Sequence, residues 1–219
     1  MSTARGMLGL ALVVLSASSS LASTDLRLGV GVGAVGFDSS LRGFRWETAP
    51  RPAPEVELTI ARGRWETGLR VRTTSTEQAF GFAATPQAAR IRWTSAEVLT
   101  RVRLAQWGPL ELSPALGFGR VDLRYDPDYV SIALSPTEEY ASRGETRVRL
   151  APIDEWLATG SLQTRLNLAP SLALAFAAER SLFRLDTAER IDDGVLEDRR
   201  TFGAWSLRAQ FVARFSLAR

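Results

Sequence analysis

Apolar and polar residues alternate with a period of two along most of the chain, and this alternation recurs in eight segments. In residues 64–74, for example, Leu69 and Val71 share one parity while Arg70 and Arg72 take the other. Successive side chains of a β-strand point to opposite faces of a sheet, so each segment predicts a strand with one apolar and one polar face. The predicted strands span residues 25–37, 54–62, 64–74, 89–105, 110–125, 156–168, 172–185 and 205–217.

The connections between these strands alternate between short turns and long segments. Short turns with Gly or Pro are expected at 62–64, 106–109 and 169–171, and long loops at 38–53, 75–88, 126–155 and 186–200. Within the third long loop, residues 147–150 are expected to extend a strand above the main sheet. An even number of antiparallel strands puts both termini and the short turns at one end, a layout typical of bacterial outer-membrane barrels.

The apolar parity shifts within the fourth predicted strand. Ile91 and Trp93 have one parity, whereas Val98 and Val102 have the other. One extra residue near 95–97, a β-bulge, would return all four to a single outward face. A helix is the alternative here, but the regular alternation of arginine with apolar residues after Thr100 favours a strand.

The fifth predicted strand contains a similar shift after residues 117–119. Leu116 and Phe118 are expected to face outward, and beyond the shift Val121, Leu123 and Tyr125 are expected to do so.

In the first predicted strand, a row of glycines takes the positions of the polar parity. Gly29, Gly31 and Gly33 would let neighbouring strands approach closely at a narrow barrel wall.

Residues 1–22 have the organisation of a cleaved secretory signal. Arg5 supplies the positive start, residues 7–15 the apolar stretch, and residues 20–22 the small-residue cleavage site. The apolar stretch is much shorter than the roughly 20 residues that a transmembrane helix needs. We therefore expect residues 23–219 to form a single exported all-β domain that crosses a membrane, if at all, with strands.

The composition narrows the function classes. All 27 basic residues are arginine, and without Arg5 they number 26 against 24 acidic residues. The arginines alternate with Asp and Glu along the strands, whereas a nucleic-acid binder needs a patch of one sign, so no nucleic-acid partner is expected. The chain contains no His and no Cys, which excludes a Ser-His-Asp triad, a thiol nucleophile and a His-ligated metal site.

Aromatic residues gather near both ends of the predicted strands. Trp65, Trp107 and Phe215 lie toward the short turns, and a second girdle is expected toward the long loops from Trp93, Tyr125, Trp156, Phe183 and Trp205. With this layout, residues 25–218 resemble the small eight-stranded outer-membrane barrels of the outer-membrane protein A, X and W type. The last strand resembles the carboxy-terminal assembly signal of those proteins, with Phe215 and Leu217 in its hydrophobic places. The resemblance implies outer-membrane lipids and the outer-membrane assembly machinery as partners.

If the apolar faces contact lipid, charged residues of the other parity enter the lumen, which in an eight-stranded barrel is just wide enough for side chains to fill. We expect these charges to pair and close the lumen. The predicted lumen network consists of Glu57, Glu66, Arg70, Arg72, Glu97, Arg101, Arg103, Glu111, Arg120, Asp122, Arg124, Arg165, Glu179, Arg208 and Arg214.

The long loops offer weaker candidates. In the first loop, Arg42, Arg45 and Arg51 flank Phe44 and Trp46, a set that could hold lipopolysaccharide phosphates beside an aromatic anchor. The last loop is rich in carboxylates that could attract calcium, although their spacing matches no known calcium loop, and a solvated loop is the favoured interpretation. The adjacent acidic pairs 138–139 and 192–193 are the remaining candidates for hydrolysis.

These observations predict an eight-stranded antiparallel transmembrane barrel in the bacterial outer membrane, of structural or surface-interaction type. No catalytic residue, cofactor or metal site is predicted. Two alternatives remain: a soluble exported barrel similar to the lipocalins, whose apolar rows would line a ligand cavity, and a narrow pore for small solutes.

Overall fold

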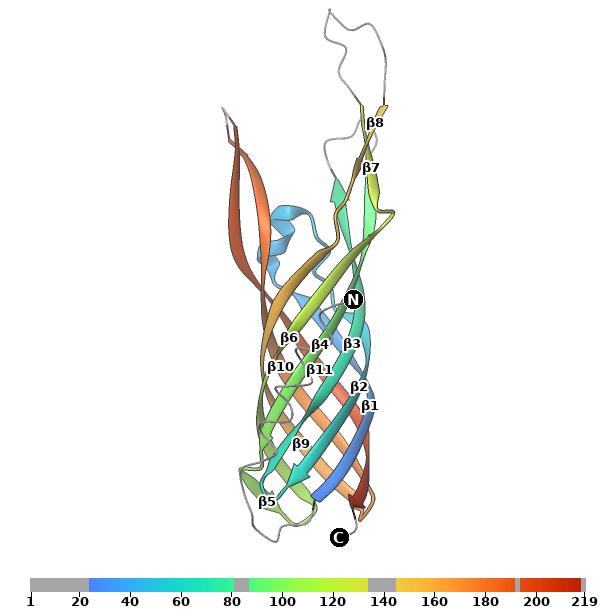
Figure 1. Ribbon diagram of the computed structural model, residues 1–219, viewed down its shortest axis with the longest axis vertical. Coiled ribbons are helices and arrows are strands. Elements are labelled where there is room, and N and C mark those ends of the chain that lie inside the picture. The colour runs from blue at the N-terminus through green and yellow to red at the C-terminus, as the bar shows by residue number, and fades with distance from the viewer. Residues whose placement is uncertain (1–23, 81–86, 134–144, 192–193, 218–219) are drawn as a thin grey trace, which may run out of the picture.

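The long strands close into a single antiparallel barrel (Figure 1). The computed structural model describes residues 24–80, 87–133, 145–191 and 194–217. Consecutive long strands pair with each other, and β1 pairs with β11 to close the ring, which confirms the predicted eight-stranded antiparallel barrel. Its long strands are β1 (Thr24–Phe37), β2 (Arg51–Arg62), β3 (Trp65–Phe80), β4 (Gln87–Val102), β6 (Leu110–Asp126), β9 (Ile153–Ala169), β10 (Leu172–Ile191) and β11 (Gly194–Leu217).

Much of what the sequence predicts as long loops is strand. The pairs β3–β4, β7–β8 and β10–β11 continue above the barrel as hairpins, and two of them stand up as separate ribbons at the top of Figure 1. The short elements are β5 (Ala105–Trp107), β7 (Tyr129–Ala133), β8 (Glu145–Arg149) and the 3-10 helix η2 (Ser39–Phe44). The expected strand at 147–150 corresponds to β8. No helix in the described part of the chain is long and apolar enough to cross a membrane.

An apolar belt surrounds the lower barrel. Large side chains such as Leu69, Phe118 and Phe211 point outward and are 49%, 55% and 63% exposed. The belt includes Leu28, Val30, Val32, Val56, Leu58, Leu69, Val71, Leu116, Phe118, Leu162, Leu168, Phe176, Leu207, Phe211, Phe215 and Leu217. A soluble lipocalin-like barrel would turn these rows inward, and the structure does the opposite.

The predicted bulge in the fourth strand is wrong. β3 and β4 pair without a register break from Trp65 opposite Val102 to Phe80 opposite Gln87. The apolar parity changes in the sequence because the surroundings of the strand change along its length. Beside the belt β4 is apolar outside, while farther up it is apolar inside, so Trp93 is buried in the lumen at 2% exposure.

The same inversion replaces the predicted slip in the fifth strand. β6 pairs with β4 and β9 in unbroken register. Val121 and Leu123 are therefore buried inside, whereas Arg124 is exposed on the outer face. A strand that passes from a lipid-like to an aqueous environment reverses its apolar face without any change in backbone parity.

The glycines of β1 allow the close strand approach that the sequence predicts. A Cβ atom on Gly31 would lie 2.3 Å from the carbonyl oxygen of Ala209 in the neighbouring strand β11. Since backbone cannot move aside as a flexible side chain does, alanine there should force the two strands apart.

We expect Gly31→Ala to lower the free energy of unfolding by about 1–3 kcal/mol, the usual range for overpacking. Gly160→Ala is the matched control, because a Cβ on Gly160 meets nothing within 4 Å. Urea unfolding followed by tryptophan fluorescence measures both. Equal effects of the two substitutions would contradict the close approach.

Candidate functional site

The lumen of the lower barrel is filled with ionic side chains. Six arginines and six glutamates point inward from the strands, each at most 12% exposed at its side chain. They are Arg27, Arg70, Arg72, Arg101, Arg165 and Arg208 with Glu55, Glu57, Glu66, Glu97, Glu111 and Glu179. They alternate along the strands with the outward residues of the belt, so the same period of two creates the apolar exterior and the ionic interior.

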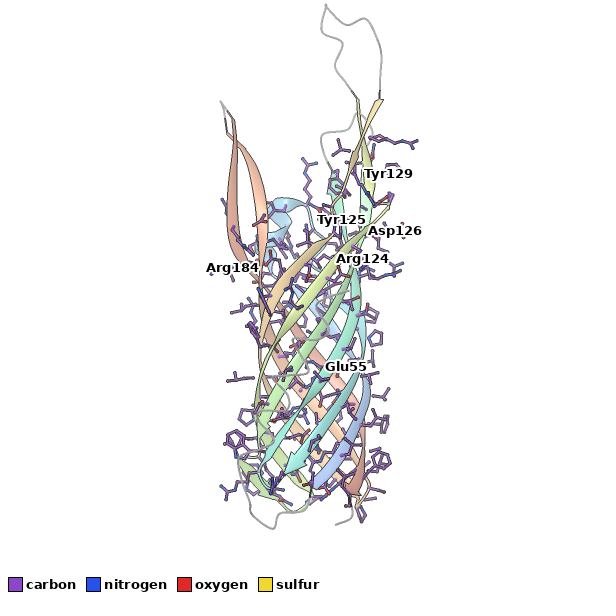
Figure 2. All side chains as sticks on the ribbon, viewed as in Figure 1. Glu55, Arg124, Tyr125, Asp126, Tyr129 and Arg184 are labelled. Carbon is purple, nitrogen blue, oxygen red and sulfur yellow. The ribbon has the colours of Figure 1, made fainter. Side chains whose placement is uncertain are left out.

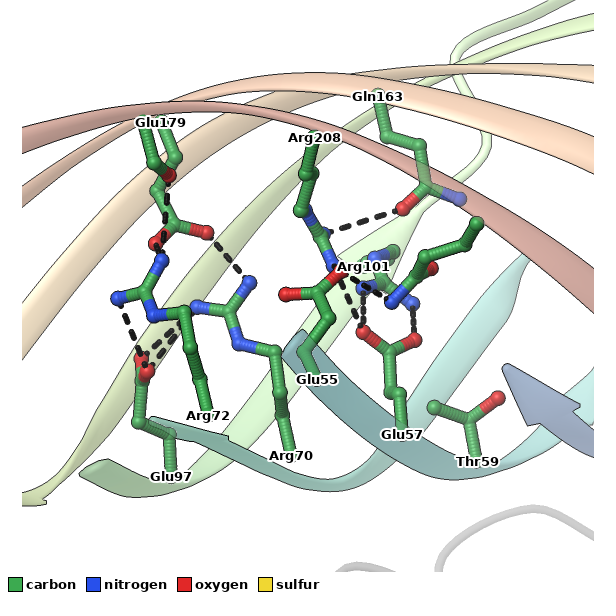
Figure 3. Close-up of polar contacts among 12 residues, drawn as sticks. Glu55, Glu57, Thr59, Arg70, Arg72, Glu97, Arg101, Gln163, Glu179 and Arg208 are labelled. Atoms are coloured by element: carbon green, nitrogen blue, oxygen red, sulfur yellow. Dashed lines mark hydrogen bonds and ion pairs between the residues drawn. The ribbon is translucent and has the colours of Figure 1, made fainter. Parts of the chain in front are cut away.

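The upper ionic layer is a quartet of Arg70, Arg72, Glu97 and Glu179 (Figure 3). Arg70 donates to both carboxylate oxygens of Glu97 at 3.1 Å and also donates to Glu179. Arg72 donates to Glu179 at 2.7 Å and lies 3.8 Å from Glu97. Two cations and two anions thus connect β3, β4 and β10 across the lumen.

The second layer contains Arg101, Arg208, Glu55 and Glu57 (Figure 3). Arg101 binds Glu57 with both terminal nitrogens, one of them at 2.6 Å. Arg208 donates to Glu55 at 3.0 Å and to Glu57 at 3.2 Å, and Gln210 donates to Glu55 at 2.6 Å. Charge-assisted hydrogen bonds of this kind compensate part of the cost of burying the charges.

A third layer lies toward the short turns and centres on Glu66. Its carboxylate accepts hydrogen bonds from Arg101 at 2.9 Å, from Arg165 at 2.9 Å and from Arg27 at 2.5 Å. These partners come from β4, β9 and β1, so one carboxylate of β3 connects four strands.

Above the ionic layers, the lumen is filled by a buried apolar cluster. Phe37 lies against Trp93 with ring centroids 4.7 Å apart, and Trp93 lies 5.4 Å from Phe183. The guanidinium of Arg72 lies 5.9 Å from the centroid of Trp93 and marks the boundary between the two regions. The cluster consists of Val35, Phe37, Leu41, Trp46, Ala53, Ile91, Trp93, Val121, Leu123, Leu157, Phe183, Leu185, Phe202 and Ala204.

The first loop folds back over this end of the barrel. It contributes Leu41 of η2 and Trp46 to the apolar cluster, at 1% and 5% exposure. Its backbone also pairs with the upper part of β3, where the amide of Glu47 donates to Glu77 at 2.7 Å and the amide of Ala79 donates to Arg45 at 3.0 Å. The loop therefore adds to the filling of the lumen.

This position removes the aromatic anchor of the predicted lipopolysaccharide site from the surface of the first loop. Trp46 is buried, and Phe44 packs edge-on against Phe202 with centroids 5.6 Å apart. Arg51 pairs with Glu47, and both side chains are partly exposed. The loop sequence shows a mixture of Arg and aromatic residues, but only the fold shows that the aromatic residues belong to the core.

The structure places ten of the predicted network residues among the buried ionic side chains: Glu57, Glu66, Arg70, Arg72, Glu97, Arg101, Glu111, Arg165, Glu179 and Arg208. Arg103 and Arg214 lie at the lower mouth, with side chains 35% and 42% exposed, and pair with Glu111 and Asp25. The sequence prediction omitted Glu55 and Arg27, although both have the lumen parity of their strands.

The prediction for Arg120, Asp122 and Arg124 is wrong, because these residues lie on the outer face above the belt. Arg120 pairs with Asp154 at 2.7 Å, and Arg124 pairs with Asp122 at 2.8 Å. Figure 2 shows Arg124 in the upper part of the molecule and Glu55 lower down in the barrel. The unbroken register of β6 is the cause, since it turns the charged parity outward.

The aromatic girdles are only partly as predicted. Trp65, Trp107 and Phe215 are exposed near the short turns. Toward the other end, Trp156 and Trp205 are exposed. The remaining members of the predicted upper girdle lie inside, where Trp93 and Phe183 are buried and Tyr125 packs against the apolar cluster.

Within the described residues, no three His, Cys, Asp or Glu side chains gather in a way that could hold a metal ion. The acidic pairs 138–139 and 192–193, and most of the side chains considered for calcium, lie outside the part of the chain whose side chains are described.

The closed barrel, with its apolar belt and inward ionic residues, has the fold of the small eight-stranded outer-membrane barrels. It is similar to the crystal structure of Neisserial surface protein A, with a TM-score of 0.52 and 9% identity over 87% of this chain and 97% of that one. It is also similar to the outer-membrane protein OprG from Pseudomonas aeruginosa, with a TM-score of 0.50 and 10% identity over 90% of this chain and 97% of that one. No family model and no curated protein match the sequence.

Proposed function

We propose that the protein is an outer-membrane barrel of structural or surface-interaction type, with a closed lumen and no catalytic role. The observation that carries the proposal is the contrast between the two faces of the wall. The belt presents large apolar side chains to the surroundings, while six arginines and six glutamates neutralise each other inside. The shared fold with outer-membrane proteins supports this location. The strand ribbons above the belt would then face the exterior.

Outer-membrane lipids, including lipopolysaccharide, are the partners that we propose for the outer wall. Just above the belt, Arg92 of β4 and Arg124 of β6 stand directly opposite each other in the register and are both exposed. Like charges at such positions repel each other, and the carboxylate of Asp122 pairs with Arg124. A phosphate beside Arg92 would balance the remaining charge through charge-assisted hydrogen bonds. At the other end, Phe215 and Leu217 on the exposed face of β11 are available to the outer-membrane assembly machinery.

Planar-bilayer recording tests whether the lumen is closed. We expect no steady conductance from the inserted barrel, because the ionic layers and the apolar cluster together occupy the lumen. Insertion is verified separately. The protein is extracted from the same lipid and run on a gel, where a band whose mobility changes on heating shows that it was folded. Stepwise currents that scale with salt concentration would show a continuous water path and favour the narrow pore instead.

A further inference from the structure

The lower mouth of the lumen carries an excess of positive charge. The two ionic layers above it each contain two arginines and two glutamates, and Asp25 at the rim is paired with Arg214 at 2.6 Å. Apart from Arg101 of the second layer, the charged residues that line the mouth are four arginines and two carboxylates, namely Arg27, Arg64, Arg103 and Arg165 with Glu66 and Glu111. The group carries a net charge of +2, which an anion with two negative charges would balance.

The same residues line a recess that is open to solvent at the short-turn end of the barrel. Its walls include Arg27, Arg64, Arg101, Arg103 and Arg165, but only two acidic residues. A second recess is also lined by Arg27 and Arg165. A lining with this charge suits an anion that approaches from solvent, and it does not suit an apolar solute.

Two arginines of this recess have hydrogen-bonding capacity that the described structure leaves unused. Arg101 and Arg165 are 1% and 5% exposed, and the Nε atom of each is buried without a hydrogen-bond partner. Buried donors in proteins are nearly always paired with an acceptor. Arg64 forms no ion pair with any described residue, so its whole guanidinium is available at the rim.

We propose that this recess binds a small oxyanion of the phosphate class. Guanidinium groups match phosphate through paired N–H···O hydrogen bonds, and a dianion matches the excess of charge. A divalent cation would be repelled by the same arginines. The inference concerns the mouth of the lumen and holds whichever function the outer wall and the ribbons serve.

The test follows the arginine Nε–Hε signals by NMR, using the purified full-length barrel folded in a phosphate-free detergent. Titration with inorganic phosphate should shift these signals saturably, whereas chloride at equal ionic strength should not. The variant R64Q/R103Q should bind phosphate at least about tenfold more weakly, because each charge-assisted hydrogen bond contributes roughly that factor. The control R149Q/R184Q removes two exposed arginines elsewhere, on β8 and β10, and should bind like the natural protein.

A second titration uses a short-chain phosphatidic acid and separates the two sources of phosphate. Saturable shifts with inorganic phosphate support a free solute, and shifts with the lipid alone support a lipid headgroup in the same recess. The proposal is overturned if neither ligand gives saturable shifts, or if R64Q/R103Q, shown to be folded by its heat-modifiable mobility, binds phosphate as tightly as the natural protein.

Discussion

Replacement of Arg70 by methionine should lower the free energy of unfolding by about 3–5 kcal/mol, the typical cost of removing one partner from a buried ion pair. Arg70 has no exposed side-chain surface and bonds both Glu97 and Glu179. Without it, two carboxylates with no exposed surface share the single guanidinium of Arg72. Urea unfolding of the barrel in lipid vesicles, followed by tryptophan fluorescence, measures the change.

Two further variants distinguish loss of charge balance from loss of packing. Arg70→Met combined with Glu97→Gln restores neutrality and should recover at least half of the lost stability. Arg184→Met removes an exposed arginine on the outer face of β10 and should cost less than about 0.5 kcal/mol. If Arg70→Met costs no more than Arg184→Met, the ionic layers do not stabilise the barrel.

Leu69→Arg should lower the free energy of unfolding by about 2–4 kcal/mol and reduce membrane insertion. An arginine at the middle of a lipid-facing belt loses its contact with water and gains no charged partner in exchange. Leu69 is 49% exposed and stands opposite Leu58 and Val98 in the neighbouring strands. All three side chains belong to the apolar outer face, so the new charge would have no nearby carboxylate. Folding into vesicles and urea unfolding together give the size of the effect.

Ala88→Arg is the matched control for this substitution. Ala88 lies on the outer face of β4, above the belt, and is exposed. In water an added arginine should change the unfolding free energy by less than about 0.5 kcal/mol. Equal costs for Leu69→Arg and Ala88→Arg would mean that the belt does not contact lipid, and the assignment of the two faces would be wrong.

The strand parity of the lower barrel can be predicted from the sequence because one environment acts along the whole segment. On β3, for instance, Leu69 and Val71 face outward while Arg70 and Arg72 face inward, as the alternation predicts. The pattern also identifies most of the ionic lumen. If the residues of one parity contact lipid, the charged residues of the other parity must face inward.

The upper part of the molecule could not be predicted in the same way. A period of two shows which residues share a face, but not whether that face meets lipid, water or the lumen. Ile91 and Trp93 therefore look like belt residues that need a bulge, and Arg124 looks like a lumen residue. The position of Trp46 depends on the fold of the first loop over the barrel end, which leaves no periodic signal.

The most direct test of the central claim is the behaviour of the protein in the outer-membrane fraction of expressing cells. That fraction is analysed by gel electrophoresis in detergent, with and without boiling. We expect the protein in this fraction, as a band whose mobility changes on heating, because a closed barrel with a lipid-facing belt resists detergent until it is unfolded. A soluble periplasmic protein without a heat-dependent shift would contradict the account.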